Sequence, residues 1–288
     1  MIPLKDNVPT ASFPVVTMVL IVVNIGFFIW QLSFSGSESS DRRLGQLGVT
    51  ERDQNSVEYG AIPYRILHPG RDCAFGVTSE TATTREADIV CQGTPEYAEA
   101  RRMAAAGAPF APYSNPPWYL TLFTSMFMHG GILHIAFNML FLWIFGNNIE
   151  DAMGRIRYLL FYLLAGVVAV YSQAAIDPQG TLPTIGASGA VAGVLGAYAL
   201  LLPRARVLTA VIIIFFVTLV EISAYVMLGI WFVLQFVPAI GQVAVPDVAG
   251  QGGVAYFAHV GGFVFGLALV KLFAHRRPPT PERIAASW

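Results

Sequence analysis

The sequence predicts an all-α membrane protein: a bundle of six transmembrane helices with a long extracytoplasmic loop between the first two spans. Of the 288 residues, 55% are apolar and only 12% are charged, whereas soluble domains carry about 25% charged residues. Six apolar runs approach or exceed the length that crosses a bilayer. Basic residues gather in alternate short loops, as in multi-pass proteins. The net charge of −1 provides no basic surface for nucleic acid.

The apolar runs define the expected spans in chain order. They cover residues 14–34, 132–149, 158–176, 187–202, 207–237 and 252–273. No small-residue cleavage site follows the first run, so we interpret it as an anchor rather than a removed signal peptide. The fifth run is too long for one upright helix and too short for two. We therefore expect 207–218 to form an interfacial or tilted entry and 219–237 the main span, with Glu221 near an interface or a partner.

The charges of the short loops predict the orientation. The basic residues lie between spans two and three, between spans four and five, and after span six, at Arg155, Arg157, Arg204, Arg206, Lys271, Arg276 and Arg277. Segments 177–186 and 238–251 contain no Lys or Arg. By the positive-inside rule both termini are cytoplasmic, and we expect a multi-pass protein of a bacterial plasma membrane. The chain then divides into the N-terminus with the first span (1–34), an extracytoplasmic insert (35–117), a catalytic core (118–275) and a cytoplasmic tail (276–288).

The insert 35–117 has no apolar periodicity and carries charges of both signs, with a helical stretch expected near 96–106. Such a segment is either a small elaborated loop or partly disordered. It contains both cysteines, Cys73 and Cys91. An oxidising compartment would favour a disulfide between them, but two free thiols are also compatible with the sequence, which does not give their distance.

Polar side chains within predicted spans are functional candidates because they are costly in a bilayer. His134 and Asn138 lie one helical turn apart on one face of span two. Ser188 opens span four, and His259 lies about seven residues into span six. Spans two, four and six all enter the membrane from outside, so these four groups fall in the same outer layer.

Small residues indicate which spans can touch. Gly189, Gly193 and Gly196 follow Ser188 in span four, and Gly262 and Gly266 share a face with His259 in span six. Glycine-lined membrane helices approach closely. The contact would bring a serine hydroxyl to a histidine that can take its proton, as nucleophilic catalysis requires.

Acyl transfer also needs hydrogen-bond donors for the developing oxyanion. His134, Asn138 and the backbone N–H of Ser188, which follows Gly186 at a helix start, could supply them. No Asp or Glu lies in this layer, which predicts a Ser–His dyad without an orienting carboxylate. Taken singly, such a serine is usually packing and such a histidine structural or a proton relay; agreement in depth and facing favours catalysis.

A metal site is disfavoured and no cofactor is required. His129, His134 and His259 all lie on the external side, but the chain has no H-E-x-x-H motif and no cysteine beside them.

Three motifs on three spans resemble the signatures of the rhomboid family of intramembrane serine proteases. They are Gly186-Ala187-Ser188-Gly189, similar to G-x-S-G; His129 through His134 to Asn138, similar to H-x-x-x-x-H-x-x-x-N; and Ala258-His259-Val260-Gly261-Gly262 with Gly266, similar to A-H-x-x-G-x-x-x-G. The resemblance covers about 118–275 and leaves the insert unexplained. It implies the six-helix rhomboid fold.

The resemblance also implies roles. Ser188 would be the nucleophile, His259 the general base, and His134 and Asn138 the oxyanion donors. Glu150 would bond neighbouring helix ends, and segment 238–251 would be a mobile cap. Two positions depart from the family: Tyr119 follows Trp118 where many members have Arg, and Ala192 stands where some members have an aromatic against the histidine, so another group must hold the His259 ring.

The expected function is therefore an intramembrane serine endopeptidase that cleaves peptide bonds in or near transmembrane segments. Its partners would be transmembrane protein substrates and the lipid bilayer. Substrates would enter from lipid past span five, where Trp231 and Phe232 either form a gate or only face acyl chains, while Gly241, Pro246 and Gly250 let the next segment hinge. An inactive relative that binds membrane clients and a transporter that uses the histidines as a relay are the alternatives.

Overall fold

A computed structural model describes residues 1–34, 39, 45, 48–80, 85–112, 116–213, 216–244 and 254–275. The chain forms two compact units. The first comprises Met1–Ile25, His129–Gln173 and the chain from Gly186 onward, and the second comprises Gly26–Met128 and Ala174–Ile185. The expected tail 276–288, with Arg276 and Arg277, and the hinge residues Pro246 and Gly250 lie outside the described residues.

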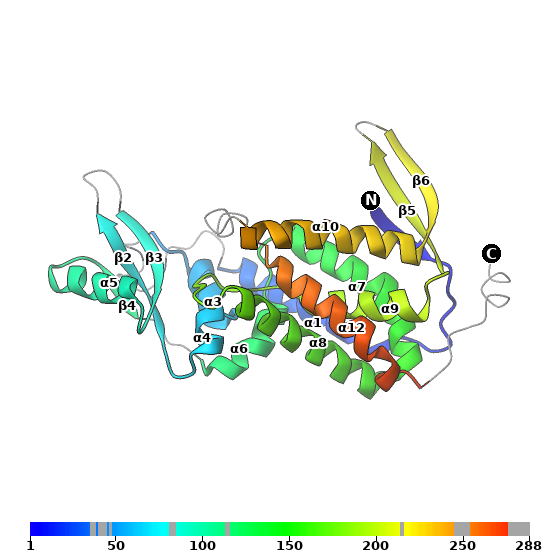
Figure 1. Ribbon diagram of the computed structural model, residues 1–288, viewed down its shortest axis with the longest axis horizontal. Coiled ribbons are helices and arrows are strands. Elements are labelled where there is room, and N and C mark those ends of the chain that lie inside the picture. The colour runs from blue at the N-terminus through cyan, green and yellow to red at the C-terminus, as the bar shows by residue number, and fades with distance from the viewer. Residues whose placement is uncertain are drawn as a thin grey trace. The chain divides into compact units, whose positions relative to one another are not determined.

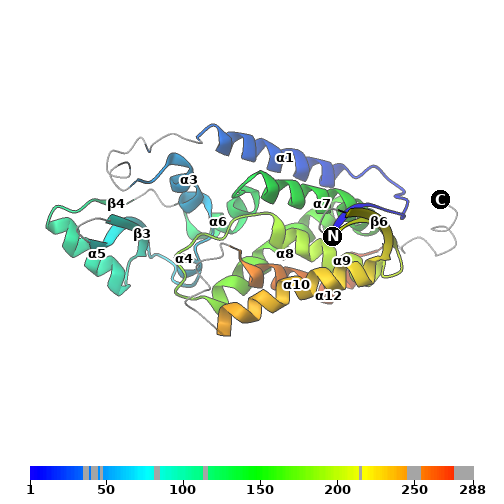
Figure 2. The ribbon, with the colours of Figure 1, turned by 90° about the horizontal axis from the view of Figure 1, so that it is seen from above.

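Long apolar helices dominate the described chain. Five described helices are long and apolar enough to cross a membrane: α1 (Val15–Leu32), α7 (Ile132–Met153), α8 (Arg155–Ile176), α10 (Ala224–Ala244) and α12 (Tyr256–Phe273). A sixth, α9 (Ser188–Leu201), is apolar but shorter. Helices α7, α8, α9, α10 and α12 run side by side (Figures 1 and 2). The protein is therefore a helical integral membrane protein.

Helix α9 is the centre of this bundle. It packs against α7, α10 and α12, and the small residues of α8 lie against its glycines. Its residues from Gly189 to Tyr198 are all buried. A helix that is apolar on every side is stable only when other helices or lipid surround it, and here the neighbouring helices do so.

The main span of the fifth run begins at Ala224 rather than at Leu219, so the expected start of this span was wrong. Residues of the run form a hairpin of β5 (Arg206–Ile213) and β6 (Phe216–Ser223), in register from Arg206 opposite Ser223 to Ile213 opposite Phe216. Strand β1 (Ile2–Asp6) pairs with β5 to complete the three-stranded sheet β1-β5-β6. The run is rich in β-branched residues, which favour strands. The all-α class was wrong to the same extent, because the chain contains two small sheets.

Helix α10 also extends further than expected, since residues 238–244 continue the helix rather than forming a loop. Gly241 is therefore a helical residue, and Pro238 lies within the helix. Glu221, expected near an interface or a partner, pairs with Arg206 at 3.2 Å.

Carboxylates anchor the N-terminal segment to the end of the bundle remote from Ser188. Glu150 of α7 accepts hydrogen bonds from the backbone N–H groups of Val16 and Thr17 at 2.9 and 2.8 Å and from the Thr17 hydroxyl. Asp6 accepts from Asn148 Nδ2 at 2.7 Å and from the Tyr198 hydroxyl at 2.6 Å. Burial raises the pKa of Asp6 to about 6, although its hydrogen bonds and Lys5 act in the opposite direction. Strand β1 is thus fixed to α7 and α9.

The second unit contains most of the insert, and its described residues are folded. Its elements are α3 (Glu51–Tyr59), α4 (Pro63–Leu67), β2 (Cys73–Glu80), β3 (Arg85–Cys91), α5 (Pro95–Ala105), β4 (Phe110–Pro112), α6 (Trp118–Thr124) and the 3-10 turn η1 (Ser125–Phe127). The sheet order is β3-β2-β4. Cys73 lies opposite Cys91 across the β2–β3 ladder, and the two form a disulfide within a core that includes Tyr64 and Phe75. The helical stretch expected near 96–106 is confirmed by α5.

Candidate active site

Ser188 and His259 meet at the start of two neighbouring helices. Ser188 is the first residue of α9, and His259 lies in the first turn of α12, which begins at Tyr256. The histidine is therefore nearer the helix start than the seven residues expected from the apolar run. Its Nε2 lies 2.7 Å from Ser188 Oγ. Both side chains are half-buried, so the pair remains open to one side.

Backbone contacts between α9 and α12 set the distance between these two residues. An added Cβ on Gly262 would overlap the carbonyl oxygen of Gly189, and one on Gly266 would overlap that of Gly193. An added Cβ on Gly193 would lie 2.5 Å from Ala165 Cβ of α8. Ordinary side chains at these positions would separate the helices, because real Cβ atoms do not approach so closely. The predicted glycine contact between spans four and six is confirmed.

Gln235 of α10 bonds the other face of the histidine ring. Its Oε1 lies 2.7 Å from His259 Nδ1. An amide oxygen can only accept, so this bond places the proton on Nδ1 and leaves Nε2 free to accept from the Ser188 hydroxyl. Trp231, one turn earlier on α10, lies with its ring centroid 6.2 Å from that of His259. The group that must replace the missing aromatic at Ala192 is thus on α10.

Sequence reasoning missed Gln235, although one signal could have revealed it. Gln235 is a polar side chain within an apolar span, and such residues are functional candidates by default. Nothing in the sequence of α10 alone gives its rotation relative to α12, so its partner could not be named.

His134 lies next to Ser188 because Gly186 leaves room for its ring. Gly186 has φ 124°, and a Cβ there would lie 2.7 Å from His134 Nε2 and 3.5 Å from Ser188 Oγ. The Gly130 backbone N–H donates to His134 Nδ1 at 3.3 Å. This bond favours the tautomer with the proton on Nε2, on the side of Gly186 and Ser188. Glycine is required twice at position 186, for its backbone conformation and for the close approach of the ring.

Asn138 follows His134 by one turn of α7 and is only 6% exposed. Its Nδ2 has no hydrogen-bond acceptor among the described residues. A buried amide without an acceptor is costly, which suggests that another molecule supplies one. Asn138 thus lies on the same helix as His134, and this helix packs against α9.

His129 borders the Ser188 site through His134, whereas Glu150 lies away from it. His129 is fully buried, and its ring packs edge-on against His134 with 5.2 Å between centroids. Glu150 lies near the opposite end of α7, at the start of α1. In the described part of the chain, no three His, Cys, Asp or Glu side chains converge as metal ligands would.

A comparison with protein families adds to this geometry. Residues 117–276, more than half of the chain, match the family described as the Rhomboid domain. The chain belongs to the rhomboid family. The match spans α6 through α12, and it contains Ser188, His259, His134, Asn138 and Gln235.

Curated rhomboid proteins share shorter stretches with the chain. It is 43% identical over 76 residues to the Rhomboid protease GluP of Bacillus subtilis, covering 26% of this chain and 14% of that protein. It is 31% identical over 160 residues to RHOMBOID-like protein 6, mitochondrial, of Arabidopsis thaliana, covering 54% and 43%. It is 31% identical over 94 residues to Inactive rhomboid protein 1 of Drosophila melanogaster, covering 33% and 6%. The chain thus spans less than half the length of each of these relatives.

Membership of this family supports an intramembrane protease role. The relatives include a protein named as inactive. The family alone therefore does not decide between an active protease and an inactive member.

Proposed function

We propose that this rhomboid is an intramembrane serine endopeptidase that uses Ser188 and His259 as a dyad. The observation that carries the proposal is the 2.7 Å contact between Ser188 Oγ and His259 Nε2, with Gln235 bonded to the other ring nitrogen. A hydroxyl is a weak nucleophile unless a base beside it can take its proton. Gln235 acts as a positioning residue that holds the ring and its tautomer.

The proposed reaction has two halves. Ser188 Oγ attacks the carbonyl carbon of the scissile peptide while His259 Nε2 takes the hydroxyl proton. His259 returns that proton to the leaving amine, which departs and leaves an acyl-enzyme. Water then attacks the ester carbonyl, giving one proton to His259, and the proton returns to Ser188 as the carboxylic acid is released. No metal or organic cofactor is part of this scheme.

Donors near Ser188 would stabilise the negative oxygen in each tetrahedral intermediate. The His134 Nε2–H, the Asn138 Nδ2–H groups and the first backbone N–H groups of α9 are the candidates. The N–H groups of a first helical turn have no intrahelical acceptor. Donors fixed in advance stabilise developing charge without reorganisation. His129 would support His134 by packing, and Glu150 would act only at the other end of the fold.

The fold suggests how water reaches a site inside a membrane. We count α9 as the fourth of six spans. Its 14 residues extend about 21 Å, less than the roughly 30 Å hydrocarbon thickness. A short central helix would start below the membrane surface, so Ser188 would be recessed yet open to the external side. The insert would be extracytoplasmic, and its disulfide is in keeping with an oxidising compartment. Both termini would then be cytoplasmic, as the basic loops of a bacterial plasma-membrane protein indicate.

Substrates would be transmembrane segments entering past α10. Trp231 and Phe232 of this helix pack against Phe263 of α12, with ring centroids 5.9 and 4.8 Å apart, and Trp231 lies 6.5 Å from Phe141 of α7. These rings would close the gap between α7 and α12, so α10 would have to move for a helix to enter.

Labelling with a fluorophosphonate tests the proposal, because only an activated serine reacts with it. The full chain in detergent should be labelled and should cleave a reporter with one transmembrane segment. Ser188→Ala and His259→Ala should each lose both labelling and cleavage. The double variant should be no worse than either single variant, since residues acting as one unit are non-additive.

Two outcomes would contradict it. Cleavage retained by Ser188→Ala would remove Ser188 as the nucleophile. Absence of labelling and cleavage in the wild type, with the fold intact by thermal unfolding, would instead place the chain with the inactive members. A transporter using the same histidines would transport a solute or protons without any labelling.

A further inference from the structure

The β5–β6 hairpin exposes apolar side chains far beyond what a water-facing hairpin would. Phe216 is 80% exposed, Val217 65%, Leu219 57% and Ile212 53%. Strand β6 is also an edge strand, because the sheet order is β1-β5-β6. Exposed apolar patches and open edges usually mark an interaction site. Something apolar is therefore expected to cover this hairpin.

The position of the hairpin indicates that membrane lipid covers it. It follows the C-terminal end of α9, remote from Ser188, and projects sideways from the bundle rather than continuing the helix axes (Figure 1). Since the helices cross a membrane, a sideways projection at their ends lies along the membrane surface. Strand β6 leads directly into α10, whose outer residues Val226, Val233 and Val237 are 46%, 54% and 62% exposed. The apolar surface thus continues from the hairpin onto a helix that lipid must surround.

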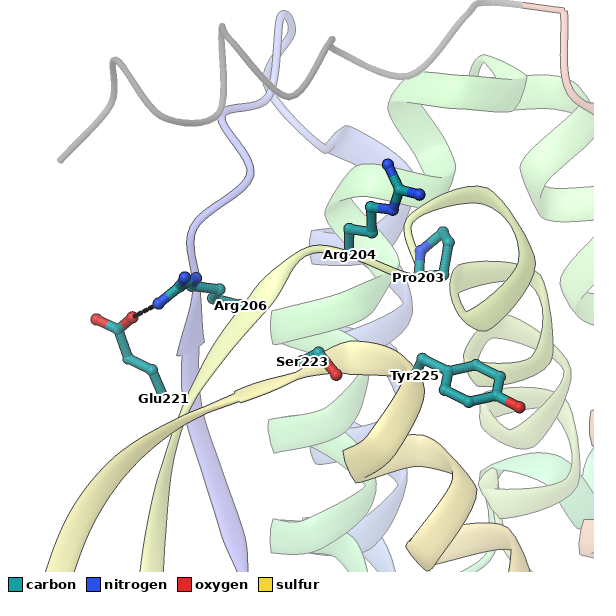
Figure 3. A pocket seen from close by; sticks show the side chains of 6 residues that line it. All are labelled: Pro203, Arg204, Arg206, Glu221, Ser223 and Tyr225. Carbon is teal, nitrogen blue, oxygen red and sulfur yellow. Dashed lines mark hydrogen bonds and ion pairs between the residues drawn. The ribbon is translucent and has the colours of Figure 1, made fainter.

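A pocket with charged, hydroxyl and apolar lining groups lies at the base of the hairpin. It has a volume of about 600 Å³ and is lined by Pro203, Arg204, Arg206, Glu221, Ser223 and Tyr225 (Figure 3). Arg206 is paired with Glu221 on one side of the pocket, and Arg204 stands apart from that pair. Within the described chain, Arg204 has no ion pair or side-chain hydrogen bond. The lining carries one net positive charge and the hydroxyls of Ser223 and Tyr225.

We propose that the hairpin and this pocket bind an anionic phospholipid. The headgroup phosphate would lie in the pocket against Arg204, with the Ser223 hydroxyl as a further donor. The acyl chains would run along the exposed side chains of β6 and the outer face of α10. Arginine clusters and tyrosines at the membrane interface suit this chemistry. The proposal rests on the membrane-spanning fold and is independent of the catalytic assignment.

Lipid is favoured over a second copy of the chain for two reasons. The exposed side chains extend past the strand edge onto α10, so pairing along β6 would cover only part of the apolar surface. A partner pairing along β6 would also leave Arg204 without an anion. Pairing of two copies through β6 remains a distinct outcome of the experiments below.

The pocket is tested by lipid retention. The whole chain is reconstituted in nanodiscs of phosphatidylcholine and phosphatidylglycerol, and lipid kept after transfer to detergent is measured by native mass spectrometry. Wild type should retain phosphatidylglycerol preferentially. Arg204→Gln should lower that retention about fivefold, the effect of one interfacial arginine. The matched control Arg157→Gln removes the same charge from the exposed start of α8, outside the pocket, and should retain lipid as wild type does.

The pocket would not be the phospholipid site if Arg204→Gln retained as much phosphatidylglycerol as wild type. The same conclusion would follow if Arg157→Gln lost as much phosphatidylglycerol as Arg204→Gln. Release of phosphatidylglycerol by an equal concentration of inorganic phosphate would show that the pocket recognises a free anion, and it would overturn the lipid assignment.

The hairpin is tested by a spin label at Val217→Cys, where the only other cysteines are joined in a disulfide. In the same nanodiscs the label should be accessible to oxygen and shielded from a water-soluble nickel complex. Accessibility to the nickel complex would place the hairpin in water and overturn the proposal. Spin–spin broadening between labels that disappears on dilution with unlabelled protein would show a second copy on β6 and would also overturn it.

Discussion

Two neighbours of α9 contribute to the same site by different means. Helix α12 meets α9 through glycines whose backbones touch, and this contact fixes the distance between Ser188 and His259. Helix α10 meets the site through long side chains, with Gln235 and Trp231 against the His259 ring. The α9–α12 contact is made by backbone atoms and leaves no room for an added atom. Helix α10, in contrast, is mostly exposed to lipid and contacts the site through side chains. The distance between Ser188 and His259 is thus set rigidly by α9 and α12, and we infer that the orientation of the His259 ring is set by a helix able to move.

The strongest test adds one methyl group on each side. Gly262→Ala should lower cleavage about 100-fold, because the added carbon would overlap the Gly189 carbonyl oxygen and displacements of about 1 Å have effects of that size. Gly229→Ala makes the same change on α10, where nothing lies within 4 Å, and should leave cleavage unchanged. Turnover of a transmembrane reporter measures both variants. Equal effects from the two substitutions would remove the distinction between the rigid and the movable neighbour.

The second test removes the bond from α10 to the histidine. Gln235→Leu should lower kcat about 10- to 100-fold with little change in KM, the range expected when a half-buried donor loses its acceptor. Gln173→Leu, the same change in α8 at a side-chain oxygen without a partner among the described residues, is the matched control. Gln235→Glu keeps an acceptor and should restore most of kcat. Because a carboxylate also stabilises the protonated ring, the acid limb of its kcat/KM profile should move to higher pH. A purely structural Gln235 would not move that limb.

The sequence predicted the contact between α9 and α12 but not the contribution of α10 to the site. The spacing of Gly189 and Gly193 against Gly262 and Gly266 predicted the α9–α12 contact, since small residues at helical spacing mark close approach. The Gln235–His259 bond depends on how α10 is rotated and tilted against α12. The apolar pattern of a lipid-facing helix contains little information on rotation, because most of its faces are equally apolar.

The parts of the fold that the sequence misassigned have a common cause. The 207–237 run was assigned by apolar length, but its first half pairs in register across β5 and β6 and its second half is a helix. Length alone does not separate a buried helix from an apolar hairpin. The sequence left the Cys73–Cys91 disulfide open against two free thiols, because the pairing depends on the cross-strand register of β2 and β3. The pattern of residues along the chain does not show which distant residues pair with one another.

The third test weakens the packing of α10 against α7 and leaves His259 and its partner Gln235 unchanged. Phe141→Ala removes the α7 ring that lies 6.5 Å from Trp231. An aromatic pair contributes about 0.5–1.5 kcal/mol, so cleavage of a helical substrate should rise about two- to tenfold. Cleavage of a short soluble peptide should stay the same, because it needs no lateral entry. Phe137→Ala, which removes an exposed ring from the same helix, should change neither rate. A parallel rise for both substrates would show that Phe141 affects chemistry rather than entry.

The last test asks whether the rigid support of α9 extends to its far end, where Tyr198 and Asn148 donate to Asp6. Burial raises the pKa of Asp6 to about 6 from an ordinary value of 3.8. The folded state therefore holds this proton more tightly than the unfolded state. The resulting stabilisation is complete below about pH 4 and is lost as pH rises through about 6. The free energy of unfolding in mixed micelles should fall by at most about 3 kcal/mol from this group between pH 4 and 7.5.

Asp6→Asn should abolish that part of the dependence of the unfolding free energy on pH, and it should change cleavage little. Asp151→Asn, which removes a carboxylate from the same end of α7 but leaves Asp6 in place, should keep the slope. An unchanged slope in Asp6→Asn would mean that another group titrates, and that the Asp6–Tyr198 contact does not control the stability of α9.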